Sequence, residues 1–146
     1  MNRFTLAITS ASVALLWTGV TAAEEITRLP ADEPVTVNGV ELACTGIGDE
    51  AQSDPRWKAF PVRLEFAGGN AQYLADVDVS VTNSLGAELF QVRCDSAWVL
   101  AKLPPGKYQV KGTFRTLVKT SNFTTPKSGQ ARIIVRFPEI VGSGDN

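Results

Sequence analysis

The sequence predicts an all-β fold, an antiparallel β-sandwich of about seven strands with one short helical segment at most. Apolar residues recur at every second position through most of the chain, as in strands with one buried face. Turns rich in glycine, proline and asparagine separate these runs. The chain has 146 residues, 44% hydrophobic and 20% charged, which is typical of a single globular domain.

Residues 1–22 are typical of a secretory signal peptide. Arg3 gives a short basic start, an apolar segment continues to Val20, and small residues favour cleavage after Ala22 or Ala23. A membrane anchor is the alternative, but five serine and threonine residues interrupt the segment, whereas a spanning helix needs about 20 predominantly apolar residues. We therefore expect a periplasmic or secreted protein with no membrane span in the mature chain.

The remaining elements follow in chain order. Residues 23–34 are polar and contain two prolines, so we expect a flexible leader there. The β-sandwich domain is expected over residues 35–138, followed by a disordered tail over 139–146. Seven runs within the domain are expected to form strands: Val40–Cys44, Val62–Phe66, Val77–Val81, Phe90–Cys94, Trp98–Lys102, Tyr108–Phe114 and Ala131–Phe137. The run that begins at Trp98 is apolar on both faces, which is typical of a central strand.

Only residues 49–59 carry a helical signal, because Asp54 offers a cap and Pro55 suits the first helical position. Acidic side chains gather around this segment. A hard cation such as Ca²⁺ needs several converging oxygens, but the spacing does not match an EF-hand loop. A solvated loop is the favoured interpretation, and we expect no metal or other cofactor. The acidic residues concerned are Asp32, Glu33, Asp49, Glu50 and Asp54.

Composition excludes several kinds of chemistry. The chain has no histidine, which excludes Ser-His-Asp and Cys-His catalysis, imidazole proton transfer and histidine-based metal sites. Two cysteines cannot supply a four-thiolate zinc or iron–sulfur site. The net charge of −1 argues against a nucleic-acid binder, which normally carries a basic excess. We therefore expect no enzymatic activity and no nucleic-acid partner.

Cys44 and Cys94 are the only cysteines, and each falls on the apolar set of its own strand. An even number of cysteines in an exported protein favours a disulfide, here one that lies in the core and bridges strands or sheets. The alternative is a pair of free thiols, one of them reactive. A C-x-x-C spacing, which would support redox chemistry, is absent.

A turn-plus-tyrosine motif carries the most information about the fold. Proline and glycine favour a tight turn, and the tyrosine two positions later can bury its ring while its hydroxyl bonds a nearby backbone group. The motif residues are Leu103, Pro104, Pro105, Gly106 and Tyr108.

Together with the strand VDVSVT and the turn NSLG, this motif resembles the carboxypeptidase regulatory-like domains. Residues 60–115 carry the similarity, and the chain is also similar to small exported bacterial proteins of unknown function built on that domain. The resemblance implies a transthyretin-like or Ig-like sandwich without catalysis. Hydrolases of the transthyretin-like fold use histidines, which this chain lacks.

Charge is unevenly distributed along the chain. Residues 23–95 contain 5 basic and 13 acidic residues, and residues 96–146 contain 8 basic and 2 acidic ones. If the strands that carry them pair, the exposed basic residues form a stripe, which would suit an anionic envelope component or an acidic partner. The alternative is cross-strand pairing with Asp76, Asp78 and Glu65. The stripe residues are Lys107, Lys111, Arg115, Arg132 and Arg136.

Two aromatic residues, Trp57 and Tyr73, flank turns and are candidates for an exposed binding platform. Covering one end of the sandwich is the alternative. Trp98 lies in the most apolar strand and is expected in the core.

These patterns favour an exported, non-catalytic β-sandwich that binds an unknown ligand, such as an envelope protein or a glycan. The alternative is a structural or accessory envelope protein that binds another protein. An enzyme that relies on carboxylates and hydroxyls is a poor third hypothesis. Exposed turn residues around Trp57 and Tyr73 would favour ligand binding, whereas an uncovered edge strand would favour strand addition by a partner.

Overall fold

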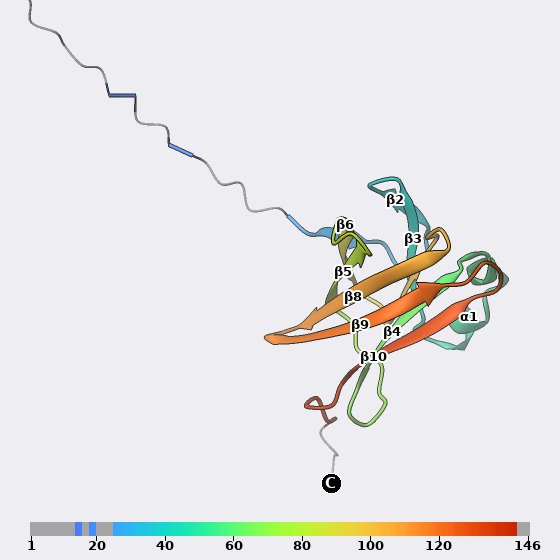
Figure 1. Cartoon of the computed structure of the whole chain (residues 1–146). Helices are drawn as coiled ribbons and strands as arrows, with labels where there is room; N and C mark the ends of the chain where they lie inside the picture. The colour runs from blue at the N-terminus through green and yellow to red at the C-terminus, as the bar shows by residue number, and fades with distance from the viewer. Residues whose placement is uncertain (1–13, 16–17, 20–24, 143–146) are drawn as a thin grey trace, which may run out of the picture.

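The computed structural model describes residues 14, 15, 18, 19 and 25–142, and within them two five-stranded sheets form a sandwich-like fold (Figure 1). Sheet A has the strand order β1-β6-β5-β8-β9, and sheet B has the order β10-β4-β7-β3-β2. The strands are β1 (Thr27–Leu29), β2 (Val35–Val37), β3 (Val40–Thr45), β4 (Val62–Gly68), β5 (Val77–Asn83), β6 (Glu88–Cys94), β7 (Trp98–Ala101), β8 (Gly106–Phe114), β9 (Leu117–Thr125) and β10 (Ala131–Phe137).

Each of the seven predicted runs forms a strand, and in six of them period-two alternation gives the strand one face for the core. The central position expected for the run at Trp98 is confirmed. Strand β7 lies in the middle of sheet B, between β4 and β3, and all four of its residues are buried. Neither face of such a strand is exposed to solvent, so apolar residues occupy both faces and the sequence does not alternate between apolar and polar residues.

Seven strands is an underestimate, since the described residues contain ten. The additional strands are β1, β2 and β9. Two of these have only three residues, too few to show a period. Strand β9 has the sequence LVKTSNFTT and lies at the edge of sheet A, where only Phe123 and Thr125 are buried. Its alternation is therefore mostly between polar residues.

The sheets are mixed rather than purely antiparallel. Strand β1 pairs parallel with β6, and β10 pairs parallel with β4 in a register that joins Ala131 to Val62. Parallel neighbours need a crossover connection rather than a hairpin. The chain supplies it, because strands β5 to β9 intervene between β4 and β10 and most of them belong to the other sheet.

The core lies between the two sheets and contains the disulfide. Cys44 on β3 of sheet B is bonded to Cys94 on β6 of sheet A, with 5.6 Å between their Cα atoms. Both cysteines are fully buried, as their phase within the strands predicts. The disulfide therefore joins the two layers. Apolar side chains around it include Leu42, Leu64, Phe66, Val79, Val92 and Phe137.

A short helical segment covers part of the outer face of sheet B. It consists of α1 (Asp49–Ser53) and the 3-10 helix η1 (Pro55–Ala59), where the sequence predicts a single segment. Asp54 caps η1 by accepting a hydrogen bond from the backbone N–H of Arg56 at 2.9 Å. Trp57 and Phe60 pack on Ala43 and Leu100 in a second buried cluster.

The predicted leader is partly wrong, because β1 belongs to sheet A and Leu29 is 1% exposed. The Asp32 backbone N–H also donates to the Cys44 carbonyl at 2.7 Å.

At the C-terminal end, the Gly69 N–H donates to the Ile140 carbonyl at 2.7 Å, so the first residues of the predicted tail contact the sandwich. The predicted signal peptide lies largely outside the described residues, as do residues 143–146.

In the part of the chain that the structure describes, no helix combines the length and apolar character needed to cross a membrane.

Candidate binding site

A groove of about 580 Å³ opens on the outer face of sheet A, where β5 ends, β8 begins and β9 ends. Thr82, Gln109 and Asn122 form one row of its floor. They lie opposite one another in the register of these three neighbouring strands. Their neighbours Val81, Val110 and Phe123 are buried in the core, so the row faces outward. The Gln109 amide N–H donates to the Asn122 amide oxygen at 3.2 Å.

A second row, a wall and the two stacked aromatic residues Tyr108 and Phe123 complete the groove. Lys107 lies opposite Thr124 in the register, one step along the same face. The turn after β5 forms the wall and contributes Ser84 and Gly86. The Asn83 side-chain oxygen holds this turn by accepting from the backbone N–H groups of Leu85 and Ala87, each at 3.0 Å. Gly86 has φ of 78°, a conformation that glycine adopts without strain.

The turn-plus-tyrosine motif positions the start of β8 beneath the groove. The Tyr108 hydroxyl donates to the Pro104 carbonyl at 2.7 Å, so the predicted bond from this hydroxyl to nearby backbone is confirmed. The Tyr108 ring stacks on Phe123 with 5.6 Å between ring centroids. Burial raises the pKa of the Tyr108 phenol above its ordinary value. Both the hydroxyl and the ring of Tyr108 are held, so the backbone of β8 is fixed at this residue. The direction in which the side chains of Lys107 and Gln109 leave the strand is fixed with it.

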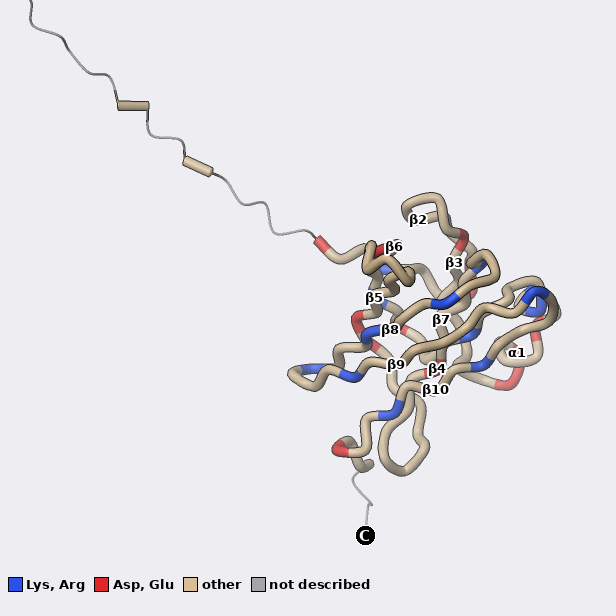
Figure 2. The backbone as a smooth tube through the Cα atoms, viewed as in Figure 1, with Lys and Arg blue, Asp and Glu red and all other residues tan. Residues whose placement is uncertain are grey.

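The predicted basic stripe does not form, because its strands belong to different sheets. Strand β8 lies in sheet A and β10 in sheet B, and they do not pair. Strand β9 lies between them (Figure 2). Lys107 and Lys111 are exposed on the outer face of β8, and Arg115 lies in the turn after it, over the Phe114 ring at 5.0 Å. The two basic residues of β10, Arg132 and Arg136, are therefore separate from these.

The alternative to the stripe, pairing with neighbouring carboxylates, is confirmed for Arg132, which binds Glu65. Asp78 instead pairs with Arg93, at 2.5 and 2.9 Å. Lys107 and Lys111 form no ion pair with any residue that the structure describes.

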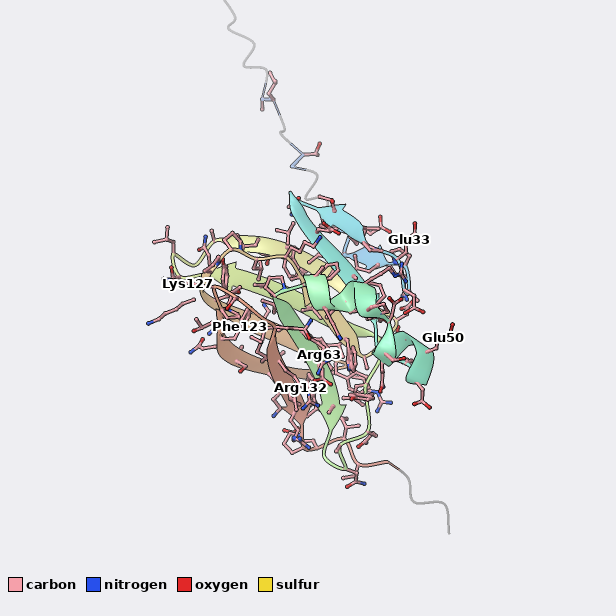
Figure 3. All side chains as sticks on the ribbon, turned by 90° about the vertical axis from the view of Figure 1, so that its right-hand side faces the viewer. Glu33, Glu50, Arg63, Phe123, Lys127 and Arg132 are labelled. Carbon is pink, nitrogen blue, oxygen red and sulfur yellow. A yellow bond between two sulfur atoms is a disulfide. The ribbon has the colours of Figure 1, made fainter. Side chains whose placement is uncertain are left out.

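Glu65 is the centre of a buried polar cluster on the outer face of sheet B. It is 1% exposed, and it accepts hydrogen bonds from Arg132 and from the Tyr73 hydroxyl, the latter at 3.1 Å. The Nε atom of Arg63 lies 3.6 Å from its carboxylate. Arg63 and Arg132 lie side by side on β4 and β10 (Figure 3). The Glu65 carboxylate raises the pKa of Arg132. The buried negative charge is therefore compensated by the arginines around it, which favours a structural role.

The two candidate platform residues do not lie together on the surface, since Trp57 is buried and Tyr73 is exposed. Trp57 is 3% exposed, and its indole N–H donates to the Ala51 carbonyl at 2.9 Å. A large ring gains more from packing under the helical segment than it would on the surface. Tyr73 is 42% exposed, with its edge against Trp98 at 6.2 Å. Trp98 is buried, as expected, beneath Arg63, whose guanidinium lies 4.4 Å from the ring centroid.

The acidic residues near the helical segment are used locally. Asp32 accepts from the Thr45 hydroxyl at 2.6 Å, and Asp54 pairs with Arg56, whose guanidinium lowers the pKa of that carboxyl. Across the described residues, no three Asp, Glu or Cys side chains are grouped so that they could hold a metal ion.

No protein-family model matches the chain, and no curated protein matches it.

Gln109 and Asn122, which define the groove, were not among the residues singled out from the sequence. The available signal was the alternation of β8, in which Gln109 lies between the half-buried Tyr108 and the buried Val110 and therefore faces solvent. Asn122 lies on a strand that the sequence does not reveal. The arrangement can bind a ligand through hydrogen bonds from amides, hydroxyls and one ammonium group.

Proposed function

We propose that this protein is an exported, non-catalytic β-sandwich module that binds a ligand in the groove on sheet A. One observation carries the proposal: three adjacent strands present a row of uncharged amide and hydroxyl side chains beside Lys107. Amides and hydroxyls both donate and accept, so converging groups of this kind can fix the orientation of a polar ligand. The row contains no carboxylate and no thiol, which supports binding rather than catalysis.

We also propose that the sandwich is transthyretin-like or Ig-like, of the carboxypeptidase regulatory-like kind. The bond from Tyr108 to the Pro104 carbonyl supports this, because it reproduces the anchoring role of the tyrosine in that motif. The buried disulfide supports export, since disulfides persist in oxidising compartments.

A second candidate function is association with another protein through strand addition. Strand β9 has nine residues, lies at the edge of sheet A and pairs only with β8. Its Val118 side chain is 53% exposed. Strand β10 of the other sheet lies alongside β9 (Figure 1), and the part of this edge that β10 leaves free offers backbone donors and acceptors to an extended peptide.

Retention of envelope material by the immobilised protein tests the proposal. We expect the protein to retain glycan or lipid from an envelope extract. The double variant Gln109→Ala/Asn122→Ala should bind about thirtyfold more weakly and retain correspondingly less, because two hydrogen-bonding groups are lost at about 1 kcal/mol each. Asn70→Ala is the matched control, since Asn70 is an exposed amide in the loop after β4.

Circular dichroism should show that all three proteins are folded. Equal retention by the double variant and the wild type would overturn the assignment of the groove. Retention of protein alone, unaffected by the double substitution, would favour strand addition at β9.

A further inference from the structure

Two lysines extend the groove along β8. Lys107 lines the groove, and Lys111 lies four residues further along the same exposed face. At about 3.4 Å per residue, their Cα atoms are about 14 Å apart, with Gln109 midway between them. A ligand that meets both ammonium groups is therefore elongated and runs along the strand over Gln109.

Both ammonium groups are available to such a ligand. Neither lysine has an ion-pair partner among the described residues, although acidic side chains occur on the neighbouring strands. On the adjacent strand β5, Asp78 is bound to Arg93. Glu88, one strand further away on β6, accepts from the Ser80 hydroxyl at 2.9 Å and keeps its charge, but it forms no ion pair with Lys111. Two lysines on one strand without an ion pair among the described residues favour a ligand that carries negative charge.

The groups between the lysines distinguish the kind of anion. Strand β8 pairs with β5 on one side and β9 on the other, so the ladders use its backbone and a peptide cannot add to it as a strand. The floor offers hydroxyl and amide side chains from Thr82, Gln109, Asn122 and Thr124. These groups match ligand hydroxyls, which also donate and accept.

We infer that the groove binds an acidic oligosaccharide, with its hydroxyls on the amide and hydroxyl floor and its carboxylates at Lys107 and Lys111. This inference rests on the proposed function and adds the class of ligand. Exposed ion pairs weaken as salt screens them, so the affinity should fall as ionic strength rises.

Calorimetric titration of the purified protein with three probes tests the inference. The probes are an oligogalacturonate, the same oligosaccharide with its carboxylates methyl-esterified, and polyglutamate. We expect binding of the oligogalacturonate, with little binding of the ester or of polyglutamate. Lys107→Glu and Lys111→Glu should each weaken binding at least about fivefold. Lys58→Glu is the matched control, because Lys58 is an exposed lysine on η1, which packs on the other sheet.

The outcomes separate the ligand class from the groove itself. If the methyl ester binds as tightly as the oligogalacturonate and the double variant Gln109→Ala/Asn122→Ala weakens that binding, the inference of an acidic ligand is overturned. The proposed function of the groove would remain intact. Preferential binding of polyglutamate would overturn it in favour of an acidic protein. Binding of no probe would overturn the acidic oligosaccharide, and the envelope retention experiment would then decide the proposed function by itself. Equal weakening by Lys58→Glu would mean that only the net charge matters.

Discussion

Tyr108 combines a stacked ring with a hydroxyl that is bonded to the backbone, and burial raises the pKa of its phenol. The folded protein therefore holds this proton more tightly than the unfolded chain does. Its contribution to stability is fully present below the unfolded pKa of about 10, and it is lost as the pH rises through the higher folded value.

We predict that the free energy of unfolding falls above about pH 10 and that part of this fall disappears in Tyr108→Phe. Urea unfolding at a series of alkaline pH values measures it. Because the chain has only two tyrosines, absorbance titration of Tyr73→Phe reports the pKa of Tyr108 alone. An ordinary tyrosine pKa in that titration would contradict the prediction.

Glu65 shows that strand alternation predicts the face on which a residue lies but not whether its side chain is exposed. Its phase in β4 correctly places it opposite the inward-facing Leu64 and Phe66. Alternation suggests a solvent-facing carboxylate, yet Glu65 is 1% exposed, because Tyr73 and two arginines close over it. Arg63 comes from β4 itself, but Tyr73 comes from a loop and Arg132 from β10, and the periodicity of β4 carries no information about either.

We predict that Arg132→Met lowers the free energy of unfolding by about 2 kcal/mol, because it leaves the buried Glu65 carboxylate with fewer partners. The value lies below that of a fully buried pair, since Arg63 and Tyr73 remain in contact with Glu65. Arg136→Met is the control, because Arg136 is exposed on the same strand and forms no ion pair among the described residues. Urea unfolding compares them, and equal losses would contradict a special role for Arg132.

Among the elements, the strands with a clear apolar set were predictable, the edge strand β10 included, and the other three edge strands were not. Strands β4, β5, β6 and β8 alternate because one face meets the core. Edge strands β1, β2 and β9 bury few side chains, so their sequences resemble loops. The groove depends on β9 and was unpredictable for the same reason.

We predict that β1 contributes to stability and is not a leader. Leu29→Ala should cost about 2 to 4 kcal/mol, because Leu29 is 1% exposed and packs in the core between the sheets. Thr27→Ala, at an exposed position of the same strand, should change stability by less than about 0.5 kcal/mol. Urea unfolding measures both variants. If Leu29→Ala is as stable as the wild type, residues 25–34 act as a leader after all.

For the whole molecule, periodicity indicates which face of a strand is buried but not which strands are neighbours. The basic stripe was predicted on the condition that β8 and β10 pair, and the chain instead places them in separate sheets. What remains on sheet A is the pair Lys107 and Lys111, on either side of Gln109. Which basic residues lie beside the groove therefore depends on which strands belong to sheet A.

The disulfide is the one covalent cross-link between side chains of the two sheets, and an oxidising compartment is where such a bond persists. Cys44 and Cys94 are separated by 50 residues, so the disulfide removes considerable freedom from the unfolded chain. We predict that reduction lowers the free energy of unfolding by up to about 4 kcal/mol, as measured by urea unfolding with and without a reductant. Thiol titration under denaturing conditions should find no free thiol in exported protein and two in protein retained in a reducing cytosol. Two free thiols in the exported protein would contradict both the covalent link and the oxidising compartment.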